Sequence, residues 1–347
     1  MKIAFRVDAN NEIGGGHLVR CLVLARSLAA GGADICFLTN NSLSAIDPVH
    51  SGFSVIRAEK PASPIAPMLT TAFPDTGADV LVIDHYEINE AEERAARAQT
   101  HFILSFDDMP TRRHDCDLLV DQNFGTDPAE YTALISPGSR VLAGSQFALL
   151  REEFGRSRAE ALQHRVSGQS RGVFVCFGMS DQMGMTFDVL QALFSIGYNS
   201  PINIVIGSSS TKLDDIRAVA DGDRRIALAI DPTEIAPIMS RSAVAIGGGG
   251  SMHWERCCLG LPAVCVVLAE NQRRVSERLV RGGAIELASI SEGDDLHTLA
   301  CKVAALEGDD VRRNEMSRRA AATCDGMGAA RIVDAISALT KLAPTRA

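Results

Sequence analysis

Short apolar runs alternate with amphipathic segments along the whole chain. Six runs in the N-terminal half read as strands, and several of them end in a polar residue: Lys2–Val7, Ala33–Thr39, Ser54–Arg57, Val80–Asp84, Phe102–Phe106 and Leu118–Val120. Segments with helical spacing lie between them, such as Leu18–Leu28 and an Ala- and Glu-rich stretch at about 89–99. Strands that alternate with helices at this spacing predict a parallel, doubly wound sheet.

The C-terminal half repeats this alternation. Its predicted strands are Gly172–Phe177, Ile202–Ile206, Ile226–Ala229, Val244–Ile246 and Ala263–Leu268. A polar, charged stretch from Glu152 to Arg171 separates the two halves and predicts a domain boundary. We therefore expect an α/β protein with two Rossmann-like domains, 1–155 and 172–347, joined by a linker at 156–171 and facing each other across a cleft. The last helix could pack back on the N-terminal domain.

Length and composition narrow the class of protein. The chain has 347 residues, more than one core usually supports, and 46% of them are hydrophobic, which fits two globular domains. A net charge of −9 argues against a nucleic acid or an anionic membrane as the main partner. The nine cysteines are scattered without a C-x-x-C pair, no signal peptide is visible, and no apolar run is long enough to span a bilayer. We expect a cytoplasmic protein with reduced thiols.

A glycine triplet joins the first strand to the first helix. Such a turn lets a ligand approach the main chain closely, and the free N–H groups of the helix then face that ligand. The side chain at the mouth of the turn is His17. Because an imidazole has a reference pKa of about 6.5, it can act as a general base near neutral pH. The alternative is that His17 only caps or packs the start of the helix.

A second glycine-rich turn, Gly247–Ser251, follows a strand in the C-terminal half. Four consecutive glycines are costly in entropy unless close backbone approach is needed. The turn lacks the Gly-Lys-Ser/Thr of a Walker A loop, so it predicts a diphosphate site built from backbone N–H groups. Glu255, one turn into the next helix, could accept hydrogen bonds from ribose hydroxyls; the alternative is a solvated helix residue.

Polar residues also follow other predicted strands of the first half. Asp84, His85 and Tyr86 should emerge at the same sheet edge as His17, where Tyr86 could donate a hydrogen bond to a reacting group; the alternative is a rim residue. A metal site is the less favoured reading of the acidic residues farther along, because Asp at strand ends also caps helices and no His or Cys joins them at ligand spacing. These residues are Asp107, Asp108, Asp115, Asp117 and Asp121.

Taken together, the motifs resemble those of a known family. They are F-R-V-D-A-N-N-E-I-G-x-G-H-x-x-R-C from Phe5, I-D-H-Y at Ile83–Tyr86, L-S-F-D-D at Leu104–Asp108, A-L-L-R-E-E-F at Ala148–Phe154, G-G-G-S-x-x-W-E-R-C-C-L-G-L-P from Gly248, and A-E-N-Q at Ala269–Gln272. This set is similar to the UDP-2,4-diacetamido-2,4,6-trideoxy-β-L-altropyranose hydrolases of pseudaminic acid biosynthesis. The resemblance spans nearly the whole chain. One loop departs from it, because Gly178–Met183 stands where the family usually has Gly-Gly-Ala/Thr-Asp-Pro.

The resemblance implies a GT-B fold and an inverting, metal-independent hydrolysis of a UDP-sugar, without a cofactor, by a monomer. His17 would take a proton from the water that attacks the anomeric carbon, Tyr86 and Asn271 would assist, and Glu255 would hold the ribose. The remaining implied contacts to substrate or UDP are Arg6, Asp8, Gly15, Gly16, Gly178, Gly249, Gly250, Ser251, Glu270 and Gln272. The resemblance leaves open whether the sugar ends on flagellin or on a surface polysaccharide.

Three alternatives remain at this point. A MurG-like glycosyltransferase would share the fold and the donor site but would use an acceptor hydroxyl in place of water. A hydrolysing UDP-HexNAc 2-epimerase would convert UDP-GlcNAc. A nucleotide-sugar-binding protein would bind the ligand without turnover, as fold alone does not decide function.

Overall fold

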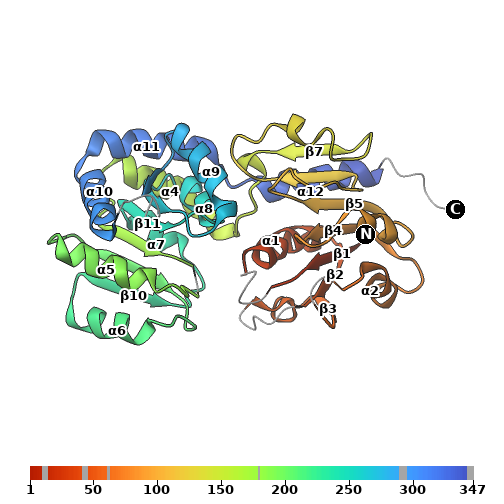
Figure 1. Cartoon of the computed structure of the whole chain (residues 1–347), viewed down its shortest axis with the longest axis horizontal. Coiled ribbons are helices and arrows are strands. Elements are labelled where there is room, and N and C mark those ends of the chain that lie inside the picture. Colours follow the sequence, from red (N-terminus) through yellow and green to blue (C-terminus); the bar gives the residue numbers. More distant parts are fainter. Residues whose placement is uncertain (10–14, 41–45, 61–62, 179, 289–294, 342–347) are drawn as a thin grey trace. The chain divides into compact units, whose positions relative to one another are not determined.

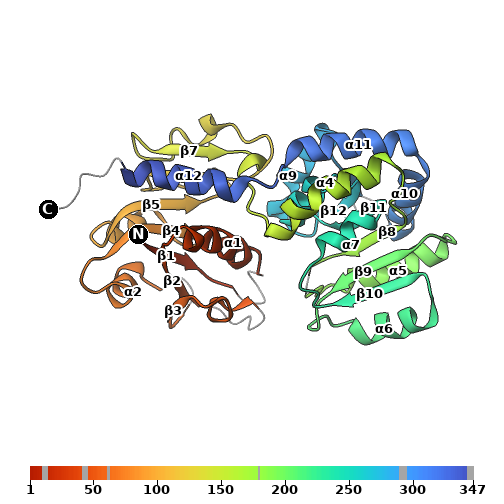
Figure 2. The same cartoon turned by 180° about the vertical axis from the view of Figure 1, so that it is seen from behind.

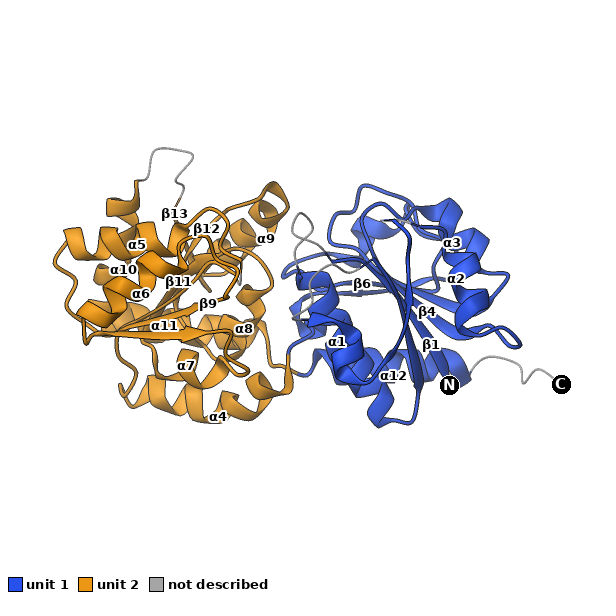
Figure 3. Ribbon diagram, turned by 90° about the horizontal axis from the view of Figure 1, so that it is seen from below, with its two compact units in different colours: residues 1–150, 327–347 blue, residues 151–326 orange. Residues whose placement is uncertain are grey.

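The computed structural model describes residues 1–9, 15–40, 46–60, 63–178, 180–288 and 295–341. The chain forms two compact units, of which unit 1 comprises Met1–Leu150 with Met327–Ala347 and unit 2 comprises Arg151–Gly326 (Figure 3). Each unit contains one sheet with helices on both faces (Figure 1). Among the described residues, no helix is both long and apolar enough to cross a bilayer.

Unit 1 has a seven-stranded sheet in which all neighbouring strands are parallel. The spatial order is β3-β2-β1-β4-β5-β6-β7. The strands are β1 (Lys2–Val7), β2 (Asp34–Thr39), β3 (Ser54–Arg57), β4 (Ala78–Asp84), β5 (Thr100–Phe106), β6 (Leu118–Asp121) and β7 (Arg140–Ala143). Most of their residues are apolar, with polar residues mainly near the strand ends, as expected for a sheet whose two faces are covered by helices.

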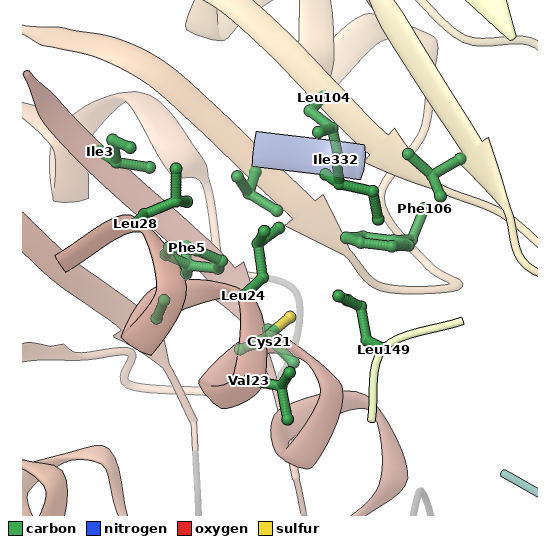
Figure 4. Close-up of a cluster of buried hydrophobic side chains, with 14 of the residues drawn as sticks. Ile3, Phe5, Cys21, Val23, Leu24, Leu28, Leu104, Phe106, Leu149 and Ile332 are labelled. Atoms are coloured by element: carbon green, nitrogen blue, oxygen red, sulfur yellow. The ribbon is translucent and has the colours of Figure 1, made fainter. Parts of the chain in front are cut away.

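Alternate residues of β1 enter different cores. Ile3 and Phe5 pack with Leu24 of α1 and Ile332 of α12 on one face (Figure 4), whereas Ala4 packs toward α2 on the other. This follows from the period of two along a strand. The helices of unit 1 are α1 (Gly16–Ala30), α2 (Ile65–Ala72), α3 (Glu90–Ala96) and α12 (Gly328–Lys341). Figure 2 shows α12 beside α1, so the end of the chain completes the first core.

Unit 2 has a six-stranded parallel sheet of order β10-β9-β8-β11-β12-β13. The strands are β8 (Val173–Cys176), β9 (Ile202–Ile206), β10 (Ile226–Ile230), β11 (Val244–Gly248), β12 (Ala263–Val266) and β13 (Glu286–Ala288). The helices are α4 (Glu152–Val166), α5 (Met185–Ser195), α6 (Leu213–Gly222), α7 (Ala236–Arg241), α8 (Met252–Cys258), α9 (Glu270–Arg281), α10 (Leu296–Gly308) and α11 (Asp310–Thr323).

Strand order reverses once in each sheet, and these two points locate the candidate sites. In unit 1 the chain runs outward from β1 to β3 and then returns to place β4 on the other side of β1. In unit 2 the same reversal falls between β8 and β11. Loops that leave the carboxyl ends of strands diverge at such a point, which opens room for a ligand. His17 follows β1, Asp84 ends β4, Gly178 follows β8 and Gly249 follows β11.

The stretch expected to be a linker is mostly a helix. Residues 152–166 form α4, which packs against α7 and α8 within unit 2. Glu153, Phe154, Ala161 and Arg165 are buried, while Glu152, Arg156 and Glu160 are exposed. Because the apolar stripe of α4 is this narrow, its composition resembles that of a linker. The chain enters unit 2 at Arg151 and leaves it at Gly326.

Candidate functional site

His17 and Asp84 form the centre of the site in unit 1. His17 is the second residue of α1, and its Nδ1 lies 2.5 Å from Oδ1 of Asp84, the last residue of β4. Arg20, one turn farther along α1, donates to both carboxylate oxygens at 2.5 Å. Burial favours the neutral form of Asp84, but the charges of Arg20 and His17 outweigh it and hold the pKa of this carboxyl well below its usual range. Asp84 is therefore an anion.

The pairing with Asp84 determines which nitrogen of His17 is available for chemistry. An ionised carboxylate can only accept, so the proton of a neutral imidazole sits on Nδ1 and leaves a lone pair on Nε2. The contact of 3.1 Å between Nδ1 and Nη2 of Arg20 arises because both nitrogens donate to Oδ1 of Asp84. The side chain of His17 is 14% exposed, against 1% for Asp84. This arrangement suits a general base oriented by a buried carboxylate.

The turn after β4 brings Tyr86 next to His17. The two rings meet edge to face, with centroids 4.9 Å apart, and the Tyr86 hydroxyl donates to Oδ2 of Asp108 at 3.0 Å. Arg112 holds this turn through its Nη1, which donates to the carbonyls of His85, Tyr86 and Ile88 at 2.9, 2.6 and 2.8 Å. The structure thus brings together the two residues of unit 1 that the sequence suggested as catalytic.

The glycines before His17 are only partly described. Gly14 and the four residues before it lie outside the described residues. Gly15 is the N-cap of α1, and its carbonyl accepts from the Val19 N–H at 2.9 Å. Among the described residues no side chain caps the start of α1, and Gly16, its first residue, is exposed. Both glycines therefore adjoin His17 at the helix start.

Arg6 and Asp8, suggested as substrate contacts, lie in the interior. Both are almost fully buried and form an ion pair with each other. Asp8 also accepts from Nε2 of His85 at 3.0 Å and from the backbone N–H of Asn40 at 2.6 Å. These bonds connect the segments that follow β1, β2 and β4. Arg6 and Asp8 therefore link these segments from the interior, and their contact with a substrate stays a prediction.

The acidic residues considered as a metal site have other partners. Asp107 and Glu93 both contact His114, at 3.1 and 2.8 Å. Burial opposes the charge of His114, but these two hydrogen bonds prevail and raise its pKa to about 9. Asp115 and Asp117 form ion pairs with Arg97, at 2.8 and 2.9 Å. Within the described residues, no three His, Cys, Asp or Glu side chains are placed to hold a metal ion.

In unit 2, the turn Gly247–Ser251 connects β11 to α8 and is closely packed on its inner side. A Cβ on Gly247 would lie 2.3 Å from the carbonyl oxygen of Cys176, and one on Gly249 would lie 2.7 Å from Oγ of Ser276. On Gly250 the nearest atom would be 3.8 Å away, and Ser251 is exposed. Only glycine fits at the first and third positions of this turn. Gly178, which follows β8, has a φ of 97° and open space beside its Cα.

Glu255 lies one turn into α8 and is largely shielded from solvent. Its side chain is 13% exposed, and Oε1 lies 3.5 Å from Nη2 of Arg151. Burial raises the pKa of Glu255, with Arg151 opposing the shift. A shielded carboxylate of this kind is a good acceptor for hydroxyl groups, since few water molecules compete for it.

The first residues of α9 have different environments. Oε1 of Gln272 accepts from the N–H groups of Gly249 and Leu268, at 3.3 and 3.1 Å, so Gln272 supports the glycine turn. Asn271 is exposed, and Glu270 is exposed and paired with Arg273 at 3.2 Å. Of these three suggested contacts, Gln272 hydrogen-bonds directly to the turn.

Two residues of the His17 cluster were not recognised from the sequence as part of the site. The sequence places Asp84 at the end of a strand without indicating a role for it, and Arg20 occurs only within the first motif. The spacing of Arg20, three residues after His17, was the available signal, because such residues share a helix face.

No family model matches the chain. The chain does match a curated protein, the UDP-2,4-diacetamido-2,4,6-trideoxy-beta-L-altropyranose hydrolase of Campylobacter jejuni subsp. jejuni serotype O:2. The two are 29% identical over 289 residues, which cover 82% of this chain and 97% of that protein. The resemblance to this hydrolase is confirmed. A second relative, the spore coat polysaccharide biosynthesis protein SpsG of Bacillus subtilis, is 21% identical over 57% of this chain and 58% of that protein.

Solved structures show the fold. MurG of Acinetobacter baumannii superposes with a TM-score of 0.68 at 14% identity, over 97% of this chain and all of that one. UDP-GlcNAc 2-epimerase of Neisseria meningitidis superposes with a TM-score of 0.62 at 13% identity, again over 97% and 100%. The protein has the GT-B fold. Identities this low say nothing further about the reaction.

Proposed function

We propose that the protein is a hydrolase that releases UDP from UDP-2,4-diacetamido-2,4,6-trideoxy-β-L-altrose. The observation that carries the proposal is the His17–Asp84 pair, which leaves Nε2 of His17 able to accept a proton. The resemblance to the Campylobacter jejuni hydrolase supports the choice of substrate. The reaction would be a step of pseudaminic acid biosynthesis.

In this proposal the proton moves to His17 as water attacks. Nε2 of His17 takes one proton from water while the water oxygen bonds to the anomeric carbon, and the bond from that carbon to the UDP oxygen breaks. The negative charge of Asp84 stabilises the imidazolium that results, and Arg20 keeps Asp84 ionised. Attack opposite the leaving UDP inverts the anomeric configuration. His17 then returns the proton to solvent.

The other suggested residues have supporting roles. Tyr86 and Asn271 assist at the sugar and the diphosphate. In unit 2, the backbone of Gly249, Gly250 and Ser251 binds the diphosphate and Glu255 accepts from the ribose hydroxyls, a role that its shielded carboxylate supports. Gly15, Gly16 and Gly178 leave room for the ligand beside the main chain, as glycines do.

Three further features belong to the proposal. The hydrolysis needs no metal ion, the enzyme works as a monomer, and it resides in the cytoplasm. The nine cysteines, all of them unpaired, support the last point, because disulfides form mainly in oxidising compartments.

The test is to incubate the purified protein with this donor and EDTA, without an acceptor. Release of UDP and free sugar supports the proposal. A donor that is consumed only when an acceptor is added would make the protein a glycosyltransferase, and conversion of UDP-GlcNAc would make it a 2-epimerase. Binding of UDP without any turnover would leave a nucleotide-sugar-binding protein.

A further inference from the structure

Arg256, in α8, lies directly against the glycine turn of unit 2. Its Nη2 donates to the carbonyl of Gly248 at 2.7 Å, and a Cβ on Gly247 would lie 2.8 Å from its Nη1. The residue is only 1% exposed. The guanidinium therefore lies on the inner side of the turn. The backbone of the turn would separate it from a ligand bound on the outer side.

Among the described residues, no carboxylate is hydrogen-bonded to Arg256, and the nearby Glu255 interacts with its charge only at longer range. The hydrogen-bond partners of Arg256 are a carbonyl and the imidazole of His253, both of which are neutral, and Nε and Nη1 have no partner among the described residues. A buried cation without a hydrogen-bonded carboxylate is costly, so an anion bound on the other side of the turn would relieve part of that cost.

A chain of hydrogen bonds joins Arg256 to the start of α9. Nη2 of Arg256 donates to Nδ1 of His253 at 3.1 Å, so the proton of the imidazole is on Nε2, which donates to Oγ of Ser276 at 3.0 Å. The Ser276 hydroxyl donates to the carbonyl of Gln272 at 2.7 Å, and the Gln272 side chain accepts from the Gly249 N–H. Burial, reinforced by the charge of Arg256, lowers the pKa of His253 well below its ordinary value, which keeps this tautomer neutral.

We propose that Arg256 is a positioning residue of the nucleotide site. It holds the glycine turn in shape through Gly248 and His253, and it supplies the positive charge that makes the turn favour a diphosphate. This inference rests on the proposed binding of UDP at Gly247–Ser251. It goes beyond that proposal because it assigns the preference for a diphosphate to one buried side chain that the ligand does not touch.

The experiment compares the dissociation constants of UDP and uridine by calorimetry, since uridine lacks the phosphates. Arg256→Gln keeps a side-chain donor but removes the charge, and it should weaken UDP binding about tenfold while uridine binding stays unchanged. Arg256→Lys keeps the charge and should retain most of the preference for UDP. Equal weakening of both ligands in Arg256→Gln would show a merely structural role and overturn the inference. If Arg256→Gln does not fold, loss of the UDP preference in a folded Arg256→Lys protein would overturn it.

Arg165 provides a matched control in the same unit. It is also buried, and it donates to the carbonyls of Leu259, Ser242 and Met239 at 2.8, 2.7 and 3.0 Å, away from the glycine turn. Arg165→Gln should lower the melting temperature and leave the ratio of UDP to uridine affinity unchanged; a selective loss of UDP affinity in this variant would contradict the inference.

Donor hydrolysis measured on the same preparations separates the two proposals. If the wild-type protein does not hydrolyse the donor but Arg256→Gln loses UDP affinity as expected, only the proposed hydrolase activity is refuted. If the wild-type protein hydrolyses the donor but Arg256→Gln keeps the same ratio of UDP to uridine affinity, only the role of Arg256 is refuted. Failure of the wild-type protein to bind UDP would refute the inference itself.

Discussion

Nδ1 of His17 lies 2.5 Å from a carboxylate oxygen of Asp84, and this bond ties the start of α1 to the end of β4. The two residues are 67 positions apart, and the adjacency of β1 and β4 brings them together. Asp84 is fully buried and ionised, so it fixes both the orientation of the imidazole and its tautomer.

Replacing Asp84 by Asn should therefore impair catalysis far more than binding. The amide of Asn can donate to Nδ1, which would move the imidazole proton to Nε2 and remove the lone pair that accepts a proton from water in the proposed mechanism. We expect kcat to fall on the order of 10³- to 10⁴-fold, as for the equivalent change in a serine protease triad, with little change in the dissociation constant of UDP. Measuring kcat of the variant, and its dissociation constant for UDP by calorimetry, checks this expectation. A nearly unchanged kcat would show that Asp84 does not set the tautomer of His17.

Arg112 should matter through the turn that carries Tyr86. Its Nη1 contacts the carbonyls of three residues in that turn, so Arg112→Ala would free the Tyr86 ring to leave His17. Misplacement of a catalytic group by about 1 Å can cost up to about 10²-fold in rate, and we expect a loss of kcat in that range. The neighbouring Arg113 is exposed and serves as the control. Equal kcat values for Arg112→Ala and Arg113→Ala would refute the positioning role.

His114 should make the stability of the protein depend on pH. Its pKa in the folded state is raised to about 9 from an ordinary 6.5, so its charge stabilises the fold fully below pH 6.5, and this contribution is lost as pH rises through about 9. His114→Gln should cost roughly 3–5 kcal/mol of unfolding free energy near pH 6 and less above about pH 9. Urea unfolding at several pH values measures this difference.

The control for His114 is His164, whose imidazole lies 3.7 Å from the exposed Glu160. His164→Gln should leave the free energy of unfolding almost unchanged at every pH. A penalty for His114→Gln that stayed constant from pH 6 to about pH 10 would mean that the imidazole is not charged in the folded protein.

Gly247 should not tolerate a side chain. It is paired with Cys176 in the β11–β8 ladder, and a Cβ would lie 2.3 Å from the carbonyl oxygen of that residue. Gly247→Ala should cost about 1–3 kcal/mol or more, because backbone atoms cannot move aside as a flexible side chain would. Gly222→Ala, at the end of α6, meets no atom within 4 Å and provides the comparison. Equal melting temperatures for the two variants would contradict the packing described here.

Much of the fold and part of the site could be predicted from the sequence. Parallel strands deliver their carboxyl ends to one edge, so an apolar run ending in Asp84 and a glycine turn ending in His17 could be placed together without coordinates. The sequence does not predict β7 and β13, which have four and three residues. The sequence predicts a linker over much of α4 because charged side chains dominate that stretch.

Local sequence patterns do not predict which charged residues pair in the folded protein. The family resemblance implies Arg6 and Asp8 as ligand contacts, and only the structure shows that they form a buried ion pair with each other. His114 and Glu93 are 21 positions apart, and only the folded chain shows that they form one buried cluster with Asp107. Spacing along the chain reveals which residues share a helix face or a sheet edge, but it does not reveal which buried charges meet across different elements.

The central claim is that His17 activates water for attack at the anomeric carbon. The most direct measurement is the turnover of the UDP-diacetamido-altrose donor in ¹⁸O-labelled water, without an acceptor. NMR identifies the anomer of the sugar that forms first, and mass spectrometry shows whether the released UDP carries ¹⁸O. We predict unlabelled UDP, a sugar of inverted configuration, and loss of turnover in His17→Ala with UDP binding retained. Labelled UDP would place the attack on phosphorus, and together with an active His17→Ala enzyme it would contradict the proposed mechanism.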